Sequence, residues 1–287
     1  HNYDPTFVMR NEKRVKLRNS VPGEGQWGQG VATKKVDYSH DLIAEEALKF
    51  IDSSKNGPFF LYLAATLPHA NNEARNQGME IPDLGIYKNK DWPQVEKNYA
   101  AMVTRMDRDV GRILKQIADL GLDSNTIVFF TSDNGPTDWP VKYETGPPAG
   151  FTGPYRGRKW SLFEGGIRVP CLMRWPGKIK AGSRSDAVLS ALDLFPTLCA
   201  LAKVDVGSHQ LDGEDITGIL TGVQEDLPSR ELFWHTGSHA ELKRGQWTAL
   251  RQGDWKFLET AKGEQHLFNL AQDPHEKANL KAQHPKL

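Results

Sequence analysis

Two short segments of this 287-residue sequence carry residue types that bind cations or move protons. Ser132-Asp133-Asn134-Gly135 follows an apolar run and sets a carboxylate beside an amide, two hard oxygen ligands that suit Ca²⁺ or Mg²⁺. The same tetrapeptide is a common turn sequence, so both interpretations stay open. Pro68-His69 also follows an apolar run. His69 could bind an anion, protonate a leaving group or be merely structural.

A third segment, from Tyr155 to Pro170, is rich in glycine and cations. Lys159 lies within it and could neutralise an oxyanion. The alternative is a solvated loop with ordinary surface charge. The sequence contains no Walker-type phosphate-binding loop, so nucleotide binding is not implied.

The overall composition excludes several classes of protein. With 38% hydrophobic and 25% charged residues the chain is ordinary for a globular protein, which excludes a wholly disordered one. The 36 basic and 36 acidic side chains cancel, so we expect no nucleic-acid partner and no steering toward an anionic membrane. No run approaches the roughly 20 apolar residues of a membrane span, and the polar first residues show no signal peptide. Cys171 and Cys199 lie in apolar sequence and are expected to be buried free thiols rather than a disulfide.

Strands and helices alternate in the part of the chain that must position these side chains. Residues 59–64 and 126–131 are continuous apolar runs, typical of strands buried on both faces. Apolar residues recur at helical spacing over about 43–56 and 92–120, which predicts two helices. This alternation indicates an α/β sheet with helices on its faces.

The rest of the chain divides into an irregular N-terminal part, a middle part and a C-terminal part with a different sequence pattern. Residues 1–38 are expected to be irregular, and a strand and a helix are expected over 169–174 and 189–202. The last part predicts a small antiparallel sheet of four short strands separated by turn residues, over 232–235, 247–251, 255–258 and 266–270. We therefore expect residues 1–227 to belong to a main α/β domain. Residues 228–287 are expected to form a small antiparallel subdomain with a helix.

The three polar segments together resemble the sulfatase family, of the arylsulfatase and N-acetylgalactosamine-6-sulfatase type. Their order matches, and the segment from Gly157 to Pro170 fills the pattern Gly-x-Lys-x₄-Glu-Gly-Gly-x-Arg-x-Pro without a gap. Further segments that look like the family are Leu192-Asp193-Leu-Phe-Pro196-Thr197, Leu211-Asp212-Gly213, Gly253-Asp254-Trp255-Lys256, Leu267-Phe-Asn-Leu270 and Asp273-Pro274. The resemblance covers nearly the whole chain. It implies part of an alkaline-phosphatase-like α/β/α sandwich with a small C-terminal antiparallel sheet.

The resemblance also implies roles for individual residues. Asp133 and Asn134 match two ligands of the family's catalytic Ca²⁺, with Mg²⁺ as a possible substitute. His69 matches the histidine that contacts the sulfate or the leaving-group oxygen, and Lys159 matches the lysine that clamps a sulfate oxygen. A divalent cation and a lysine stabilise the negative charge that builds as a sulfuryl group is transferred.

Other residues of the matched segments are expected to support the site or to line it. Glu164 and Arg168 are expected to support the Lys159 loop rather than to touch substrate. The candidates for lining a sugar pocket are Trp139, Tyr155, Trp160 and His235, of which His235 is predicted to bind substrate.

The family's nucleophile is not found in the sequence. It is a formylglycine made from Cys or Ser in a Cys/Ser-x-Pro-x-Arg motif, which neither Cys171 nor Cys199 begins; Ser20-Val-Pro22-Gly-Glu24 has Glu where Arg belongs. The Asp-Asp pair of the metal site and the upstream Lys-x-His segment are also absent. In the family these lie N-terminal to the matched region. We therefore expect a C-terminal portion that is inactive alone, and that either arises by truncation or proteolysis or needs the N-terminal half as its partner.

The resemblance implies a sulfuric ester hydrolase that acts on sulfated carbohydrates or aryl sulfates. It also implies a periplasmic or secreted location, or a lysosomal one in an animal. One alternative is a phosphoryl-transfer relative in the alkaline phosphatase superfamily, against which the Lys159 loop argues. The other is a non-catalytic sulfatase-like protein that binds sulfated glycans or a protein partner. Retention of His69, Asp133, Asn134 and Lys159 disfavours that second alternative.

Overall fold

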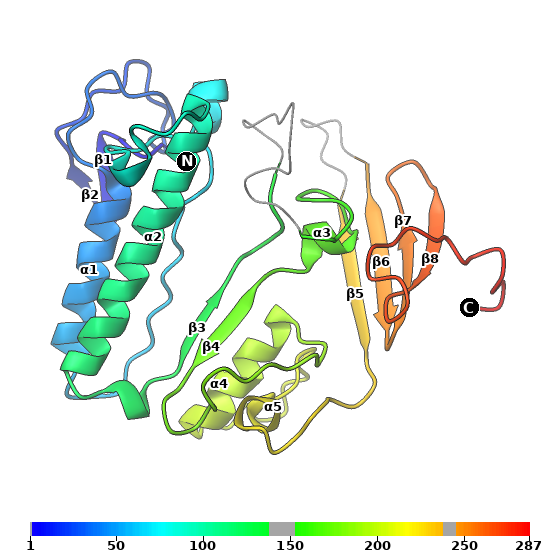
Figure 1. Cartoon of the computed structure of the whole chain (residues 1–287). Helices are drawn as coiled ribbons and strands as arrows, with labels where there is room; N and C mark the ends of the chain where they lie inside the picture. The colour runs from blue at the N-terminus through cyan, green and yellow to red at the C-terminus, as the bar shows by residue number, and fades with distance from the viewer. Residues whose placement is uncertain (1, 138–152, 238–244) are drawn as a thin grey trace. The chain divides into compact units, whose positions relative to one another are not determined.

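The computed structural model describes residues 2–137, 153–237 and 245–287 (Figure 1). Internal contacts divide these residues into two compact units. The first unit holds the described residues through Leu122, and the second holds Asp123–Thr137 and the described residues from 153 on. The domain boundary expected near residue 228 remains a prediction.

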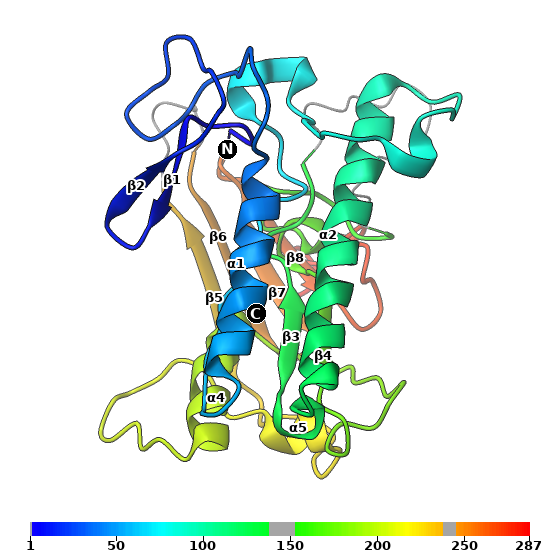
Figure 2. The same cartoon turned by 90° about the vertical axis from the view of Figure 1, so that its left-hand side faces the viewer.

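Two helices that lie side by side form the body of the first unit (Figures 1 and 2). They are α1 (Ser39–Ser54) and α2 (Gln94–Asp119), and both confirm helices predicted from the sequence. The short 3₁₀ helices η1 (Asn72–Gln77) and η2 (Gly85–Tyr87) precede α2. Among the described residues no helix combines the length and the apolar character that a membrane span requires.

The prediction that residues 1–38 are irregular was wrong over one hairpin. Strands β1 (Phe7–Arg10) and β2 (Lys13–Lys16) pair in antiparallel register, with Arg10 opposite Lys13. The sequence pattern does not predict the hairpin because β2 is exposed along its whole length. A strand that buries neither face does not show the alternation of apolar and polar residues by which strands are recognised.

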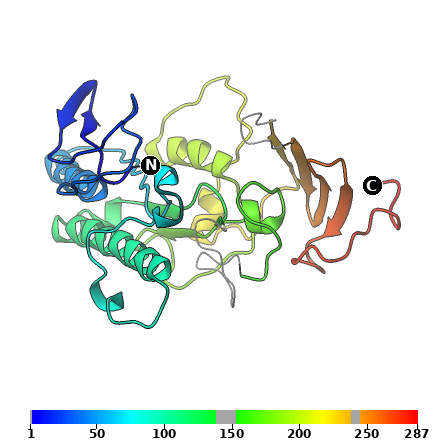
Figure 3. The same cartoon turned by 90° about the horizontal axis from the view of Figure 1, so that it is seen from above.

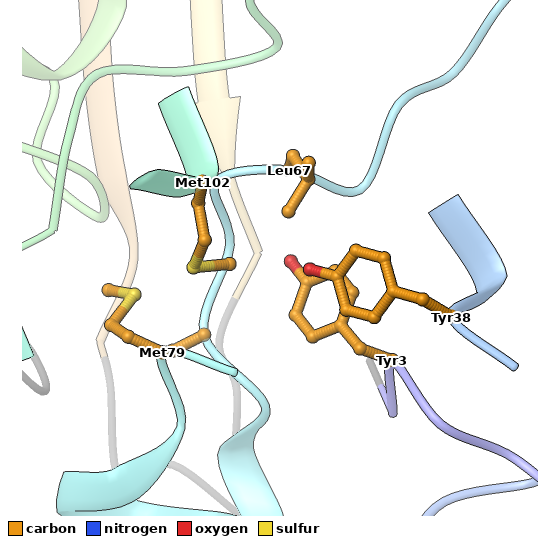
Figure 4. Close-up of a cluster of buried hydrophobic side chains, with 6 residues drawn as sticks. Tyr3, Tyr38, Leu67, Met79 and Met102 are labelled. Carbon is orange, nitrogen blue, oxygen red and sulfur yellow. The ribbon is translucent and has the colours of Figure 1, made fainter. Parts of the chain in front are cut away.

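The core of the first unit is a cluster built around two tyrosines (Figure 4). The rings of Tyr3 and Tyr38 stack with centroids 5.4 Å apart, and Leu67, Met79 and Met102 pack around them. The Tyr3 hydroxyl also donates hydrogen bonds to the carbonyl oxygens at residues 66 and 69. This cluster therefore holds the segment that carries Pro68 and His69.

The prediction of a doubly buried strand over residues 59–64 was wrong. The segment is not a strand, and its side chains alternate between half-buried and exposed. Phe59 packs edge-on against Phe50 of α1, while Phe60 and Tyr62 are 72% and 81% exposed. A β-ladder needs a neighbouring strand, and none of the described segments pairs with this one.

A two-stranded ladder and four short helices make up one part of the second unit. Strand β3 (Val128–Thr131) follows the 3₁₀ helix η3 (Asp123–Asn125) and pairs antiparallel with β4 (Cys171–Arg174). The 3₁₀ helix η4 (Ala191–Asp193) leads into α4 (Leu194–Ala202), and α5 (Thr217–Thr221) follows. The strands near 126–131 and 169–174 and the helix near 189–202 are thus confirmed.

Two burial expectations for this part were wrong. Strand β3 is half-buried at three of its positions and exposed at Thr131, because only β4 pairs with it among the described residues. Both cysteines are free as predicted, but Cys171 is exposed and Cys199 is half-buried. Apolar neighbours in sequence do not bury a side chain that faces the open side of a two-stranded ladder.

The C-terminal antiparallel sheet is confirmed. Its strands run in the order β5 (Glu231–Thr236), β6 (Trp247–Gln252), β7 (Trp255–Glu259) and β8 (Gln265–Asn269). The short helix α3 (Glu164–Ile167) and the residues before it lie against this sheet (Figure 3). The described residues of 228–237 and 245–287 contain no helix, since those after β8 form turns that include Pro274 and Pro285.

A buried ion pair joins η4 to the segment that leads into β5. Asp193 is fully buried, and the guanidinium of Arg230 donates to both of its carboxylate oxygens, at 2.5 and 2.6 Å. Burial opposes ionisation of Asp193. The hydrogen bonds from Arg230 and from the backbone amides of Glu214 and Ser190 outweigh that burial and lower the pKa of the carboxyl.

We predict that Arg230→Met destabilises the fold strongly, because it leaves a buried carboxylate without its partner. The free energy of unfolding in urea is expected to fall by about 3 kcal/mol. The matched control is Arg184→Met, at an exposed arginine, which should change stability by less than about 0.5 kcal/mol. Equal losses in the two variants would contradict a structural role for the pair.

Candidate functional site

Backbone hydrogen bonds join the Asp133-Asn134 turn to the loop that carries Lys159. The turn directly follows β3. The Gly135 amide donates to the Gly166 carbonyl oxygen at 2.9 Å, and the Lys159 amide donates to the Pro136 carbonyl oxygen at 2.9 Å. The structure therefore brings three of the predicted site residues into one region of the second unit.

Glycine is required where these two segments meet. A Cβ atom at Gly135 would lie 1.9 Å from the Gly165 carbonyl oxygen, and one at Gly165 would lie 2.4 Å from the Gly157 carbonyl oxygen. Both distances are far shorter than any real carbon–oxygen contact. The glycines of the two sequence motifs thus allow the backbones to approach each other closely.

The turn presents two oxygen donors of the kind that Ca²⁺ prefers. Asp133 is exposed, and Asn134 is half-buried with its Nδ2 donating to the Gly135 carbonyl oxygen at 3.0 Å. Since Nδ2 is engaged, Oδ1 is the amide atom suited to a cation. Ca²⁺ takes six to eight oxygens. The described residues contain no group of three or more His, Cys, Asp or Glu side chains placed to hold a metal. The two residues therefore suit Ca²⁺ in kind and could supply only part of the shell that such an ion needs.

Aromatic rings of the same loop accompany the cationic side chains. The Lys159 Nζ lies 5.6 Å from the centroid of the Trp160 ring, which is 45% exposed. The Arg168 guanidinium lies 4.6 Å from the centroid of the Tyr155 ring. These two aromatic residues therefore belong to the Lys159 loop, whereas Trp139 lies outside the described residues.

A buried network of charges fixes this loop to the C-terminal sheet. Lys256 of β7 is fully buried, and its Nζ lies 2.8 Å from Glu164 Oε1 and 2.9 Å from Glu276 Oε1. Glu276 Oε2 accepts a hydrogen bond of 2.6 Å from the Glu164 amide. At the loop's other end, Arg156 donates to the Glu276 carbonyl oxygen at 2.9 Å. Three buried side chains thus hold both ends of the segment that contains Lys159.

Burial dominates the electrostatics of this network. It raises the pKa of Glu276 above its ordinary value, although Lys256 and the hydrogen bond from the Glu164 amide favour the charged form. Arg168 and Arg251 contribute cations at 3.8 and 3.9 Å from Glu164. These contacts agree with a supporting role for Glu164 and Arg168, and the expectation that neither touches substrate stays a prediction.

Sequence analysis missed Lys256 and Glu276 as supports of the site. In β7, Lys256 occupies a position on the same face as Leu258, which packs against Phe163 in the core. A lysine at an inward position of an alternating strand was the one available signal. Its partners lie 92 and 20 residues away in sequence, and spacing alone could not identify them.

His69 lies in the first unit, directly after the Tyr3–Tyr38 cluster. It is half-buried, and its Nδ1 lies 2.7 Å from the Ala70 carbonyl oxygen. A carbonyl oxygen can only accept, so Nδ1 carries a proton. Nε2 is then the ring atom that gains or loses the titratable proton. An imidazolium that keeps this Nδ1 bond presents its second N–H at Nε2, which is the group that a general acid acting through Nε2 needs.

His235 is not brought together with Lys159. Directly opposite residues share a face of the sheet, so Trp234, Ala249 and Leu258 lie on the face that packs against the residues before α3. His235 lies on the other face, is exposed, and contacts Thr248 Oγ1 through Nδ1 at 3.1 Å. Its role in binding substrate remains a prediction from the sequence alone.

Comparison with known proteins defines the class. A family model described as Sulfatase matches residues 2–204, and one described as N-sulphoglucosamine sulphohydrolase, C-terminal, matches residues 156–286. A crystal structure of Ps i-CgsB in complex with k-i-k-neocarrahexaose aligns with a TM-score of 0.71 at 29% identity, over 90% of this chain and 54% of that one. The predicted fold class is thus confirmed as the α/β fold of sulfatases.

Two curated relatives establish the family. The chain is 30% identical over 290 residues to the N-acetylgalactosamine-6-O-sulfatase of Bacteroides thetaiotaomicron, covering 94% of this chain and 53% of that protein. It is 32% identical over 270 residues to human arylsulfatase A, covering 93% and 48%. The chain belongs to the sulfatase family. It spans about half the length of the curated relatives it matches.

We predict that Lys256→Met loosens the Lys159 loop and destabilises the fold. The substitution leaves two buried carboxylates uncompensated, and we expect the free energy of unfolding to fall by about 3–5 kcal/mol. Trypsin should also cut faster after Arg158 and Lys159, measured under conditions where the variant is still folded. Lys262→Met, at an exposed lysine after β7, is the matched control. Unchanged cleavage in Lys256→Met would show that the network does not hold the loop.

The raised pKa of Glu276 predicts that the loss of stability caused by Glu276→Gln depends on pH. Because the folded-state pKa lies above the ordinary value of 4.5, protonated Glu276 stabilises the fold at low pH. That contribution is lost as pH rises through the folded-state pKa. The stability lost on Glu276→Gln should therefore be largest near about pH 4 and shrink toward about pH 7. A loss that grows with pH in urea unfolding would reverse the sign and refute this assignment.

Proposed function

We propose that this chain forms part of a sulfuric ester hydrolase that acts on sulfated carbohydrates. The observation that carries the proposal is the junction of the Asp133-Asn134 turn with the Lys159 loop. It keeps a carboxylate, an amide oxygen and an ammonium group in one region of the second unit. Family membership and the curated relatives named as sulfatases support the same reaction.

The proposed chemistry is stabilisation of negative charge on a sulfate group. Lys159 binds a non-bridging sulfate oxygen, and its ammonium group offsets the charge that grows as the ester bond breaks. For His69 we propose, from the family resemblance alone, the role of an acid whose imidazolium form donates its Nε2 proton to a leaving-group oxygen, so that the sugar departs as an alcohol. The hydrogen bond from Nδ1 to the Ala70 carbonyl keeps the imidazole in the orientation for this step.

Asp133 and Asn134 are the residues that would hold Ca²⁺, with Mg²⁺ as a substitute. A divalent cation bound there would polarise a sulfate oxygen as a Lewis acid. The two side chains supply a carboxylate and an amide oxygen, so further oxygen ligands must come from water or from another segment.

The proposed reaction needs a nucleophile, which family resemblance gives as formylglycine. The sequence contains no Cys/Ser-x-Pro-x-Arg motif to produce it. We therefore propose that the N-terminal half of the same enzyme supplies the nucleophile and the remaining metal ligands. Without it, this chain is expected to bind sulfate esters but not to cleave them.

The substrate class rests on the printed names of relatives. They include an N-acetylgalactosamine-6-O-sulfatase, an arylsulfatase A and a structure with bound neocarrahexaose. We propose a sulfated sugar rather than a free aryl sulfate, because Trp160 and Tyr155 set aromatic rings beside the cations of the loop. For an enzyme with such a substrate we propose a periplasmic, secreted or lysosomal location.

We predict that Lys159→Met weakens binding of N-acetylgalactosamine 6-sulfate by about tenfold to a hundredfold, since it removes a charge-assisted contact. Isothermal titration of the chain in the presence of CaCl₂ measures the affinity. Asp133→Asn should abolish the dependence of that affinity on Ca²⁺. The matched controls are Lys178→Met and Asp186→Asn, which alter exposed side chains outside the turn and the loop.

The same titrations separate the two alternative functions. Tighter binding of N-acetylgalactosamine 6-phosphate than of the 6-sulfate would favour a phosphoryl-transfer relative. An affinity for the sulfated sugar that changes neither with Ca²⁺ nor with Asp133→Asn would favour a non-catalytic glycan-binding protein. Binding unaffected by Lys159→Met would refute the proposed site.

A further inference from the structure

The β1–β2 hairpin carries positive charge that its surroundings do not neutralise. Residues 10–18 hold five cations and one anion, in a chain whose net charge is zero. Two of the five are paired: Arg10 with Glu46 at 2.8 Å, and Arg18 with Asp37. None of the acidic side chains in the described ranges forms an ion pair with the other three, which are Lys13, Arg14 and Lys16.

The register of the hairpin separates these cations between two faces. Arg10 and Lys13 are opposite each other, and the pairing of Arg10 with Glu46 turns that face toward α1. Figure 2 shows the hairpin beside the N-terminal end of this helix. The other face carries Phe7 opposite Lys16 and Met9 opposite Arg14. We call this second face, together with Trp27, the Arg14 face.

Contacts of Arg14 bring Trp27 to the edge of this face. The Arg14 guanidinium lies 4.2 Å from the centroid of the Phe7 ring, and its Nη2 donates to the Gln26 carbonyl oxygen at 2.8 Å. The next residue, Trp27, is 79% exposed, and Met9 is 56% exposed. Arg14 and Lys16 are two residues apart on one strand, which separates their Cα atoms by about 7 Å. An exposed tryptophan thus follows directly after the residue whose carbonyl oxygen Arg14 bonds.

We propose that the Arg14 face binds the polysaccharide chain that carries the sulfate esters. Arg14 and Lys16 pair with sulfate groups of the chain, and Trp27 packs against the apolar C–H face of a sugar ring. The inference rests on the proposed function for its ligand class. It adds a contact with the polymeric ligand in the first unit.

The face fits a sulfated glycan better than it fits other polyanions. A protein that binds duplex DNA tightly typically neutralises 6–10 phosphates, and this face has two uncompensated cations. Stable membrane attachment needs a large apolar insertion or a cluster of four or more cations. A sulfated sugar needs few charges and an aromatic platform, which is the composition of the Arg14 face.

The test is the affinity of the chain for a fluorescently labelled chondroitin 6-sulfate hexasaccharide, measured by anisotropy at several salt concentrations. Lys16→Glu should weaken binding by about tenfold and reduce its dependence on salt. Trp27→Ala should weaken binding at every salt concentration. The matched controls lie at exposed residues outside this face: Lys180→Glu makes the same charge change, and Tyr62→Ala removes an exposed aromatic ring. Thermal unfolding of each variant verifies the fold.

Three outcomes would overturn the inference. Lys16→Glu could bind the hexasaccharide as tightly as Lys180→Glu does. A hyaluronan hexasaccharide, which has carboxylates but no sulfates, could bind equally well. Short duplex DNA or vesicles containing phosphatidylserine could bind more tightly than the hexasaccharide.

Failure here and failure of the proposed function are distinguishable. If Lys159→Met weakens binding of the monosaccharide 6-sulfate but Lys16→Glu leaves the affinity for the hexasaccharide unchanged, only the Arg14 face is refuted. If Lys16→Glu weakens binding of the hexasaccharide but Lys159→Met leaves the affinity for the monosaccharide unchanged, only the proposed site is refuted.

Discussion

The buried contact of Lys256 with Glu164 and Glu276 is the constraint on which the candidate site depends. One ammonium group lies between two carboxylates, and all three side chains are almost fully removed from water. Burying three charges costs several kcal/mol for each ion, so such a network contributes little net stability. It specifies position instead. The backbone amide of Glu164 and the side chain of Arg156 bond to the same glutamate, which ties both ends of the Lys159 loop to one residue.

Close backbone packing is the second constraint on the candidate site, beside the charge network. Gly135 and Gly165 approach so closely that no side chain fits between the turn after β3 and α3. The charge network positions the loop on the sheet, and the glycine contact positions the Asp133-Asn134 turn on the loop. The proposed cation ligands and the proposed sulfate ligand can then hold a fixed geometry, although each lies on a segment without regular structure.

Local patterns predicted the elements that depend on local causes. Apolar spacing gave the long helix α2, and short alternating runs gave the four strands of the C-terminal sheet. The strand predicted over residues 59–64 was wrong because an apolar run forms a strand only where another strand pairs with it. The β1–β2 hairpin was missed because β2 is fully exposed and carries three cations, so it shows no alternation of buried and exposed residues. Asp133, Asn134 and Lys159 could be identified from motifs, whereas Lys256 and Glu276 could not, since their contacts with Glu164 span 92 and 112 residues.

The central claim is that one region of the second unit binds both a divalent cation and a sulfate group. Crystals of the chain grown with CaCl₂ and N-acetylgalactosamine 6-sulfate test it most directly, through anomalous scattering from calcium and sulfur. The account predicts a calcium peak at the oxygens of Asp133 and Asn134 and a sulfate sulfur beside the Lys159 ammonium group. A calcium peak away from the turn, or a sulfate bound without Lys159, would contradict it.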